Sequence, residues 1–241
     1  MIKKVTNNID LSGVSSPLLP LIYCDFYFNS GDTEGVYFQY DENNELTSVF
    51  SLKNGCVTLV RVKEADFHEV LMFFSFLGIS DVLSDCALNE KFKGFPLLDV
   101  TTQCENTNDV EFLSVKSKIS EYRSVYNLLS DNADDFSNWY GNFSRKINSD
   151  TACGVYKFYD NSVVSTATAT AVYDKSAVVS GVFTNSGYRG KGYATECVRA
   201  LINQLHQQDV NKIYLWCEED KIPFYKKMGF NENGKIYLGK V

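Results

Sequence analysis

A glycine-rich turn between a predicted strand and a predicted helix is the feature that most constrains how this chain folds. The strand covers residues 177–184, and residues 193–207 repeat apolar side chains with the period of an amphipathic helix. The turn reads Arg189-Gly190-Lys191-Gly192-Tyr193-Ala194-Thr195. The first N–H groups of a helix have no acceptor within the helix and lie at the positive end of its dipole. Two glycines allow close approach of the backbone and two basic side chains add charge, so the turn is typical of a diphosphate site.

Two familiar nucleotide-binding motifs do not fit this turn. A P-loop requires Ser or Thr directly after its Gly-Lys pair, and Gly192 stands there. A Rossmann turn requires Gly or Ala five residues after its first glycine, and Thr195 stands there. A glycine-rich surface turn that binds nothing remains the alternative interpretation of the same residues.

The chain also contains a short internal repeat. Residues 35–41 read GVYFQYD and residues 154–160 read GVYKFYD, with five of seven positions identical. Each is followed by two further predicted strands, a helix and a strand in the same order. These elements correspond as 46–52 with 163–170, 56–62 with 177–184, 66–77 with 193–207, and 81–86 with 212–217. Only the second set has the glycine-rich turn, which predicts two related domains, at residues 1–110 and 111–241.

Composition excludes several classes of protein. The chain has 241 residues, 44% of them hydrophobic, and only 4 Pro, which indicates a folded globular protein. No apolar run approaches the roughly 20 residues of a membrane span, and the N-terminus has no apolar signal core. A net charge of −7 argues against a nucleic-acid surface. We therefore expect no membrane or nucleic-acid partner.

Cysteine and histidine usage bounds the chemistry. The chain has 7 Cys, none in a Cys-x-x-Cys pair, which predicts reduced thiols in a cytoplasmic protein. With 2 His, a histidine-rich zinc site is not expected, so we expect no metal. Charge is uneven: residues 1–110 carry a balance of −9 and residues 111–241 a balance of +2. The second half is the better host for an anionic ligand.

Three motifs in the second half resemble those of the GCN5-related N-acetyltransferase (GNAT) family. Arg189, Gly192 and Ala194 have the spacing Arg-x-x-Gly-x-Ala of its acetyl-CoA motif. Val182-Phe183-Thr184 precedes it, and Phe224-Tyr225-Lys226-Lys227-Met228-Gly229-Phe230 follows about 30 residues later, in the family's order. The element order agrees with the family over residues 112–241.

The resemblance implies an α+β fold with a mixed, V-shaped sheet flanked by helices, and acetyl-CoA as cosubstrate. The diphosphate would lie on the turn, at Arg189, Gly190, Lys191, Gly192, Tyr193, Ala194 and Thr195. The pantetheine arm would pair like a strand with Val182, Phe183 and Thr184, and the thioester would lie where two strands splay apart. Tyr225 matches the family's usual general acid, although a core aromatic is the alternative interpretation.

The general base is left open by the sequence. Glu218 and Glu219 follow the predicted fifth strand, where they could face the cleft, and a water relay is the alternative. Many family members have Asn near Glu218, so a polar contact to the cofactor arm is in doubt here. An exposed acidic turn explains the same two residues without a catalytic role.

The resemblance implies transfer of acetyl from acetyl-CoA to a primary amine by direct attack in a ternary complex. A non-catalytic acetyl-CoA-binding module and a transferase of longer acyl chains are the alternatives. The acceptor, a small molecule or a peptide, and the oligomeric state are not readable. The first half resembles the fold in degenerate form: it lacks the turn, and Lys93-Gly94-Phe95-Pro96 has no tyrosine. We expect one acetyl-CoA per chain, with the acidic half near the acceptor side of the cleft.

Overall fold

The computed structural model describes residues 1–28, 34–105, 109–130 and 135–241. Its chain divides into two compact units. Unit 1 comprises Met1–Leu98, Trp216–Ile222 and Glu232–Val241. Unit 2 comprises Asp99–Leu215 and Pro223–Asn231. The division into related domains at residues 110 and 111 stays a prediction.

Unit 1 is a mixed sheet with one helix on each face. Its elements in chain order are β1 (Ile2–Lys4), α1 (Leu19–Tyr27), β2 (Gly35–Tyr40), β3 (Leu46–Lys53), β4 (Cys56–Arg61), α2 (Phe67–Phe76), β5 (Asp81–Ser84), β6 (Lys93–Val100) and β12 (Asn231–Lys240). The strands lie in the order β1-β2-β3-β4-β5-β12-β6. β4 and β5 are parallel, whereas β1–β2, β2–β3, β3–β4 and β5–β12 are antiparallel.

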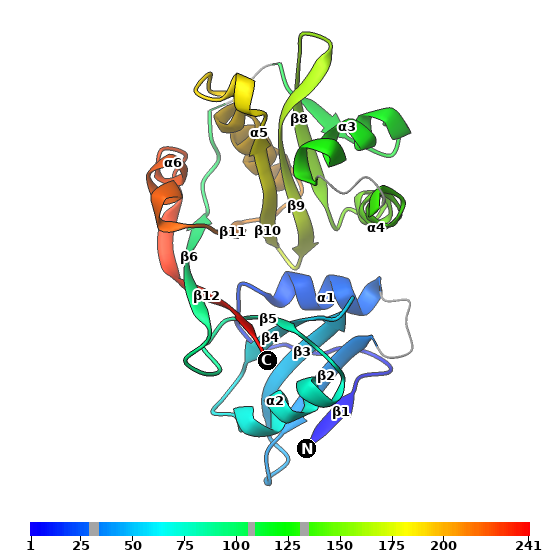
Figure 1. The fold of residues 1–241 in the computed structure, drawn as a ribbon, viewed down its shortest axis with the longest axis vertical. Coiled ribbons are helices and arrows are strands. Elements are labelled where there is room, and N and C mark those ends of the chain that lie inside the picture. The colour runs from blue at the N-terminus through cyan, green and yellow to red at the C-terminus, as the bar shows by residue number, and fades with distance from the viewer. Residues whose placement is uncertain (29–33, 106–108, 131–134) are drawn as a thin grey trace. The chain divides into compact units, whose positions relative to one another are not determined.

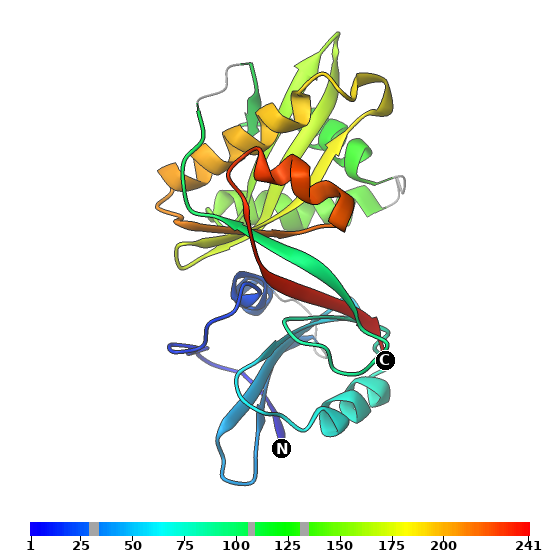
Figure 2. The same cartoon turned by 90° about the vertical axis from the view of Figure 1, so that its left-hand side faces the viewer.

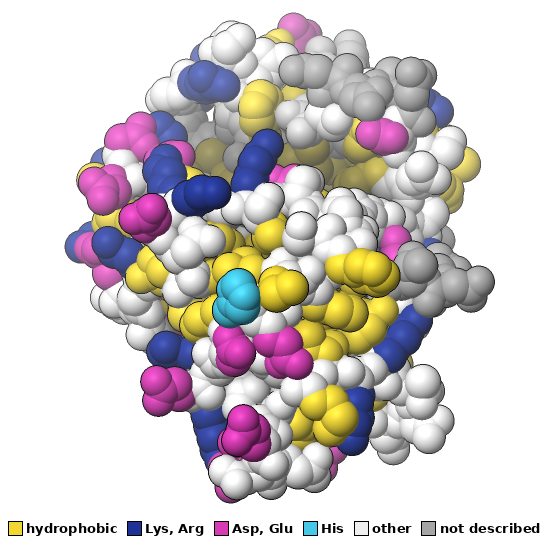
Figure 3. All heavy atoms as spheres, turned by 60° about the horizontal axis from the view of Figure 1, so that its bottom comes forward, with side chains coloured by type: hydrophobic (Ala, Val, Ile, Leu, Met, Phe, Trp, Pro, Cys, Tyr) yellow, Lys and Arg dark blue, Asp and Glu magenta, His cyan; other side chains and the backbone are white. Residues whose placement is uncertain are grey.

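The two faces of this sheet follow from the alternation along β3. Phe50 is fully buried against Phe74 of α2, with ring centroids 5.0 Å apart. Its neighbour Ser51 points the other way and donates a 2.7 Å hydrogen bond to Asp25 of α1. α2 also leaves Phe76 86% exposed. Figure 3 shows such hydrophobic side chains at the surface among charged ones.

Unit 2 is also a mixed sheet with helices on both faces. Its elements are β7 (Glu111–Leu113), α3 (Ile119–Leu129), α4 (Phe136–Asn148), β8 (Cys153–Tyr159), β9 (Ser162–Tyr173), β10 (Ser176–Thr184), α5 (Tyr193–Gln207), β11 (Lys212–Trp216) and α6 (Ile222–Lys226). The strands lie in the order β11-β10-β9-β8-β7, with β10 and β11 parallel. α5 covers one face of this sheet, and α3 and α4 cover the other (Figure 1). The α+β class and the mixed sheet are confirmed.

The sequence of strand directions is the same in the two units. β1, β2, β3 and β4 are successively antiparallel and β5 joins β4 in parallel, and β7 to β11 repeat that order. α2 and α5 are each the crossover helix between the two parallel strands. Since such crossovers are almost always right-handed, α2 and α5 cover corresponding faces. Origin by duplication stays a prediction.

The repeated heptapeptide is not a repeat in three dimensions. Tyr37 lies on the α2 face, where its ring is 5.6 Å from that of Phe73. Tyr156, its partner in the sequence match, packs instead with α3 and α4 on the opposite face. A strand has period two, so an odd offset in register reverses every side chain. The interpretation of these seven residues as matching positions is therefore wrong.

The true counterparts are identified by their contacts with the crossover helices. Gln39 donates a 2.8 Å hydrogen bond to Glu69 of α2, and Lys157 forms a 2.9 Å ion pair with Glu196 of α5. Each precedes a β-bulge in its hairpin. These two positions are offset by one residue from the sequence alignment.

The C-terminal strand completes unit 1 and not unit 2. β12 pairs antiparallel with β5, from Tyr237 opposite Ser84 to Lys240 opposite Asp81. β12 lies between β5 and β6 in the sheet, and Figure 2 shows it running alongside β6.

The structure also describes the cysteines, the length and polarity of the helices, and the grouping of side chains that could bind a metal. All seven cysteines are free thiols, and four of them are buried. None of the described helices is long and apolar enough to cross a membrane. In the described part of the chain, no three His, Cys, Asp or Glu side chains are grouped as metal ligands would be.

We expect Phe50→Ala to lower the stability of unit 1 by about 3–5 kcal/mol, because it removes a fully buried ring. Urea denaturation followed by circular dichroism measures the change. Phe76→Ala is the matched control on an 86% exposed ring, with an expected effect within about 0.5 kcal/mol. Equal denaturation midpoints for the two variants would contradict the assigned core.

Candidate functional site

The first turn of α5 has backbone N–H groups that no side chain caps. The N-cap residue that precedes the helix is Gly192, whose φ of 89° and ψ of −5° are left-handed and which makes no side-chain capping hydrogen bond. The N–H of Glu196 donates to the carbonyl of Gly192 at 3.1 Å as the first helical bond. The N–H groups of residues 193–195 precede that bond, so they need acceptors from outside the helix. This is the arrangement of an anion site at a helix N-terminus.

The two glycines of the turn are required by backbone conformation. Gly190 has a φ of +77° and Gly192 a φ of +89°, values that residues with a side chain rarely adopt. A Cβ atom built on either glycine meets nothing within 4 Å. The space over the turn is therefore open to a ligand.

The basic side chains of the turn are exposed and partly fixed. The Arg189 Nε donates a 3.1 Å hydrogen bond to the carbonyl of Thr184, which ties the turn to the end of β10. Its guanidinium lies 5.7 Å from the centroid of the Phe183 ring. The Lys191 ammonium lies 5.0 Å from the centroid of the Tyr188 ring. The structure thus brings the predicted strand and turn residues together.

β10 runs on beyond its pairing with β11. The parallel register covers Ser176, Ala177 and Val178 of β10, opposite Lys212, Ile213 and Tyr214 of β11. β10 continues to Thr184, and over residues 179–184 its described strand partner is β9 alone. The edge that contains Val182, Phe183 and Thr184 can therefore accept an extended ligand as an added strand.

A β-bulge at Gly181 redirects this part of β10. Ser180 lies opposite Thr168 and Phe183 opposite Thr166, so β10 has an extra residue between these pairs. Gly181 has a φ of +57°, and a Cβ atom there would lie 2.6 Å from the Thr168 hydroxyl oxygen. Both conformation and space require glycine here.

Tyr225 lies at the end of a short helix in unit 2. Its ring is half-buried, with centroid distances of 4.9 Å to Phe224 and 5.7 Å to Phe230. The Tyr225 carbonyl accepts a 2.9 Å hydrogen bond from the N–H of Met228. Met228 and Phe230 are buried, which anchors the segment. Phe224 is also half-buried.

Residues 118–230 match the model of the acetyltransferase (GNAT) family, and the match contains the turn, β10 and Tyr225. These residues form a GNAT domain. The resemblance read from the three motifs is therefore confirmed.

Two curated sequences are similar to part of this chain. One, named uncharacterized N-acetyltransferase ycf52, from Pyropia yezoensis, is 32% identical over 71 residues, which are 30% of this chain and 41% of that protein. Histone acetyltransferase TAP1 from Glycine max is 29% identical over 68 residues, which are 28% of this chain and 29% of that protein. The chain thus spans less than half the length of either relative.

Solved structures resemble more of the chain, at low identity. A GCN5-related N-acetyltransferase from Kribbella flavida has a TM-score of 0.60 at 16% identity, over 80% of this chain and 86% of its own. A GCN5-related N-acetyltransferase-like protein from Streptococcus suis has a TM-score of 0.58 at 13% identity, over 93% and 98%. At these identities the likeness concerns the fold.

The candidate bases lie outside the compact unit that contains the turn. Glu218 belongs to unit 1, where its carboxylate accepts hydrogen bonds of 3.2 and 3.3 Å from the Lys93 ammonium. Glu219 begins a short 3-10 helix in the same unit and is exposed. Assignment of the base among Glu218, Glu219 and water stays open.

In unit 1, the N-terminus of α2, which corresponds to the N-terminus of α5, is capped by a side chain. The Asp66 carboxylate caps α2 by accepting hydrogen bonds from the N–H groups of His68 at 2.9 Å and Glu69 at 3.3 Å. Glu42, Glu64 and Asp66 line a pocket of about 390 Å³ beside this end. The protein's own carboxylate already occupies the N–H groups that would bind a phosphate.

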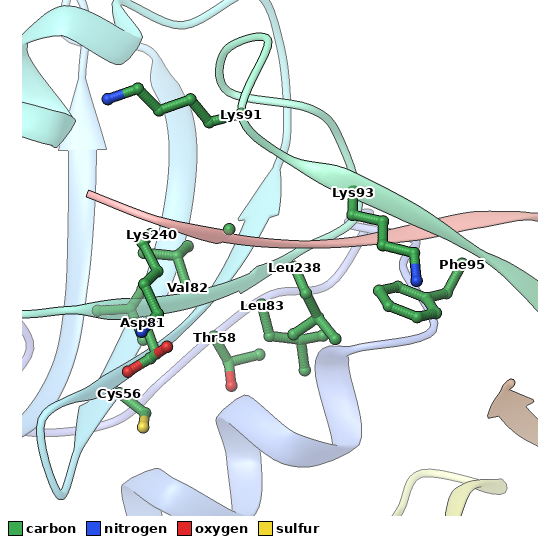
Figure 4. Close-up of a pocket in the computed structure, with 12 residues that line it drawn as sticks. Cys56, Thr58, Asp81, Val82, Leu83, Lys91, Lys93, Phe95, Leu238 and Lys240 are labelled. Atoms are coloured by element: carbon green, nitrogen blue, oxygen red, sulfur yellow. The ribbon is translucent and has the colours of Figure 1, made fainter. Parts of the chain in front are cut away.

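A further pocket in unit 1 contains none of the predicted site residues. It measures about 660 Å³ and has a largely apolar floor that includes Thr58, Leu83 and Leu238 (Figure 4). Lys93 and Phe95 lie at one end, and Lys240 and Asp81 at the other. It lacks an uncapped helix end, so it does not match the diphosphate site.

Side chains of β8 that belong to none of the three sequence motifs support the turn. The Tyr159 ring lies 6.0 Å from that of Tyr188 and 5.7 Å from that of Tyr193, by centroid distance. Lys157, two residues earlier, is buried beneath the same helix end. A lysine inside an apolar strand is a signal that could have drawn attention to this position.

Gly181→Ala tests whether the bulge requires glycine, and Gly190→Ala is its control. Both glycines have positive φ, but only Gly181 lacks space for a Cβ atom. We expect Gly190→Ala to cost about 1 kcal/mol of stability and Gly181→Ala about 1–3 kcal/mol more. Urea denaturation measures both variants. Equal losses would show that the bulge does not constrain this residue.

Proposed function

We propose that the protein transfers an acetyl group from acetyl-CoA to a primary amine by direct attack in a ternary complex. The observation that carries this proposal is the uncapped first turn of α5, which begins at the left-handed Gly192 beside the free edge of β10. The match of residues 118–230 to the GNAT family model supports acetyl transfer as the general reaction. The amine acceptor, the cosubstrate and the mechanism are parts of the proposal.

The chain offers matching groups for the diphosphate, the pantetheine arm and the thioester of acetyl-CoA. The N–H groups of residues 193–195 and the side chains of Arg189 and Lys191 would hold the diphosphate. The free edge at Val182–Thr184 would pair with the amides of the pantetheine arm. The divergence of β10 from β11 after Val178 would leave room for the thioester. The residues therefore fit this cosubstrate.

Tyr225 is the proposed proton donor. Acetyl-CoA supplies a thioester, whose carbonyl carbon accepts an amine and releases a thiolate. A phenol of pKa about 10 can protonate a thiolate whose conjugate acid has a pKa of about 8.5, or hold its charge by a hydrogen bond. The attacking amine must be neutral, so Glu218, Glu219 or water would accept its proton.

One acetyl-CoA per chain follows from the contrast between the two helix ends. Gly192 leaves α5 open, whereas Asp66 occupies the end of α2 with a carboxylate. The acidic balance of −9 in residues 1–110 would favour a cationic acceptor electrostatically. The proposed acceptor is a small-molecule or peptide amine. The proposed location of the protein is the cytoplasm.

Gly192→Asp should abolish most acetyl-CoA binding, because a carboxylate at the helix cap competes with the diphosphate and repels it. Gly192→Asn is the isosteric neutral control, and Asn tolerates left-handed φ. We expect calorimetry to give one site per wild-type chain, and an affinity for the Asp variant lower than for the Asn variant by about 100-fold. Wild-type affinity in the folded Asp variant would remove the diphosphate from this turn.

Tyr225→Phe keeps the ring and removes the phenolic proton. We expect kcat to fall by about 10²–10⁴-fold with little change in acetyl-CoA affinity. Release of free thiol in the presence of an amine screen measures turnover, and Tyr237→Phe in unit 1 is the control. Unchanged turnover would make Tyr225 a packing residue. If the wild-type protein binds acetyl-CoA without turnover, the non-catalytic binding module is favoured. If it turns over a longer acyl-CoA faster than acetyl-CoA, a transferase of longer acyl chains is favoured.

A further inference from the structure

Lys157 is a buried cation beneath the proposed diphosphate site. It lies on β8 with 8% of its surface exposed, and its ammonium is 2.9 Å from a carboxylate oxygen of Glu196. The same ammonium lies 5.6 Å from the centroid of the Tyr193 ring, at the first residue of α5. Burial would lower the pKa of Lys157, but the hydrogen bond and charge of Glu196, with Asp109 and Tyr193, outweigh it and raise the pKa.

Glu196 poses an electrostatic problem for that site. It stands in the first turn of α5, four residues after Gly192. A carboxylate there is attracted by the same helix end that would bind the diphosphate. Because its charge has the sign of the diphosphate, an unneutralised Glu196 would weaken binding.

We propose that Lys157 is a positioning residue that acts through Glu196: it neutralises this carboxylate from beneath and keeps the open end of α5 usable by a diphosphate. The inference rests on the proposed function. Lys157 does not need to touch the ligand for this role. Its charge is held on a strand, so it stays in place when the ligand is absent.

Unit 1 provides the internal comparison. At the position that corresponds to Lys157, Gln39 offers Glu69 a neutral amide at 2.8 Å. The N-terminal ammonium pairs with Glu69 from the exposed side at 3.1 Å. There the helix end is closed by Asp66, so no anion has to be bound. A glutamine thus fits this position in the fold, and the strand supplies a charge only beneath the open helix.

The test is a double-mutant cycle of Lys157→Gln and Glu196→Gln, with acetyl-CoA affinity measured by calorimetry. We expect Lys157→Gln to weaken binding about tenfold, Glu196→Gln to leave it unchanged or strengthen it, and the double variant to return close to wild type. S-acetylpantetheine, which lacks the diphosphate, is the control ligand and should bind all four proteins alike.

The opposite effects of the two single variants distinguish neutralisation of Glu196 by Lys157 from an ion pair that is only structural. If the ion pair of Lys157 and Glu196 only stabilised the fold, both single variants would bind acetyl-CoA more weakly and the double variant would not recover. That result would overturn the inference. Wild-type affinity in folded Lys157→Gln would also overturn it. If Lys157→Gln does not fold, Glu196→Gln decides alone, since weaker acetyl-CoA binding contradicts the inference. A wild-type protein that binds no acetyl-CoA overturns the proposed function and this inference with it.

Discussion

The uncapped first turn of α5 is the constraint on which the rest of the site depends. Gly192, the residue before the first turn, has no side chain, so nothing at that position accepts hydrogen bonds from the N–H groups that follow. In unit 1 the carboxylate of Asp66 satisfies them. A carboxylate and a phosphate compete for the same donors, so the residue at the cap decides whether a helix end is closed or open to an anion. The two units share strand order and directions but differ at this position.

The surrounding strands make the open helix end part of a longer groove of backbone donors and acceptors. The bulge at Gly181 and the end of β10–β11 pairing at Val178 together free one edge of β10 next to the turn. The hydrogen bond from Arg189 to Thr184 fixes the turn to that edge. From the other side, Tyr159 and Lys157 of β8 hold the first turn of α5. The free edge of β10 and the open N-terminus of α5 together suit an extended ligand with an anionic end.

Local features of the site could be predicted from the sequence, and long-range ones could not. The glycines, the amphipathic helix and the three motifs are each contained in a few consecutive residues. The sheet face on which Tyr37 or Tyr156 lies is fixed by the packing of its strand against the helices of its own unit, so an apparent five-of-seven identity gave the wrong register. The pairing of β12 with β5 joins segments about 150 residues apart, and Lys157 meets Glu196 through the fold alone. No spacing rule connects such residues.

The most direct test is a titration of the backbone amides with acetyl-CoA by nuclear magnetic resonance. The account predicts that the amide signals of residues 190–195 and 182–184 shift together and saturate at one equivalent per chain. It also predicts that the amides of His68 and Glu69, which Asp66 already occupies, do not move. Shifts centred on α2, or an unchanged α5 N-terminus at saturation, would contradict the central claim.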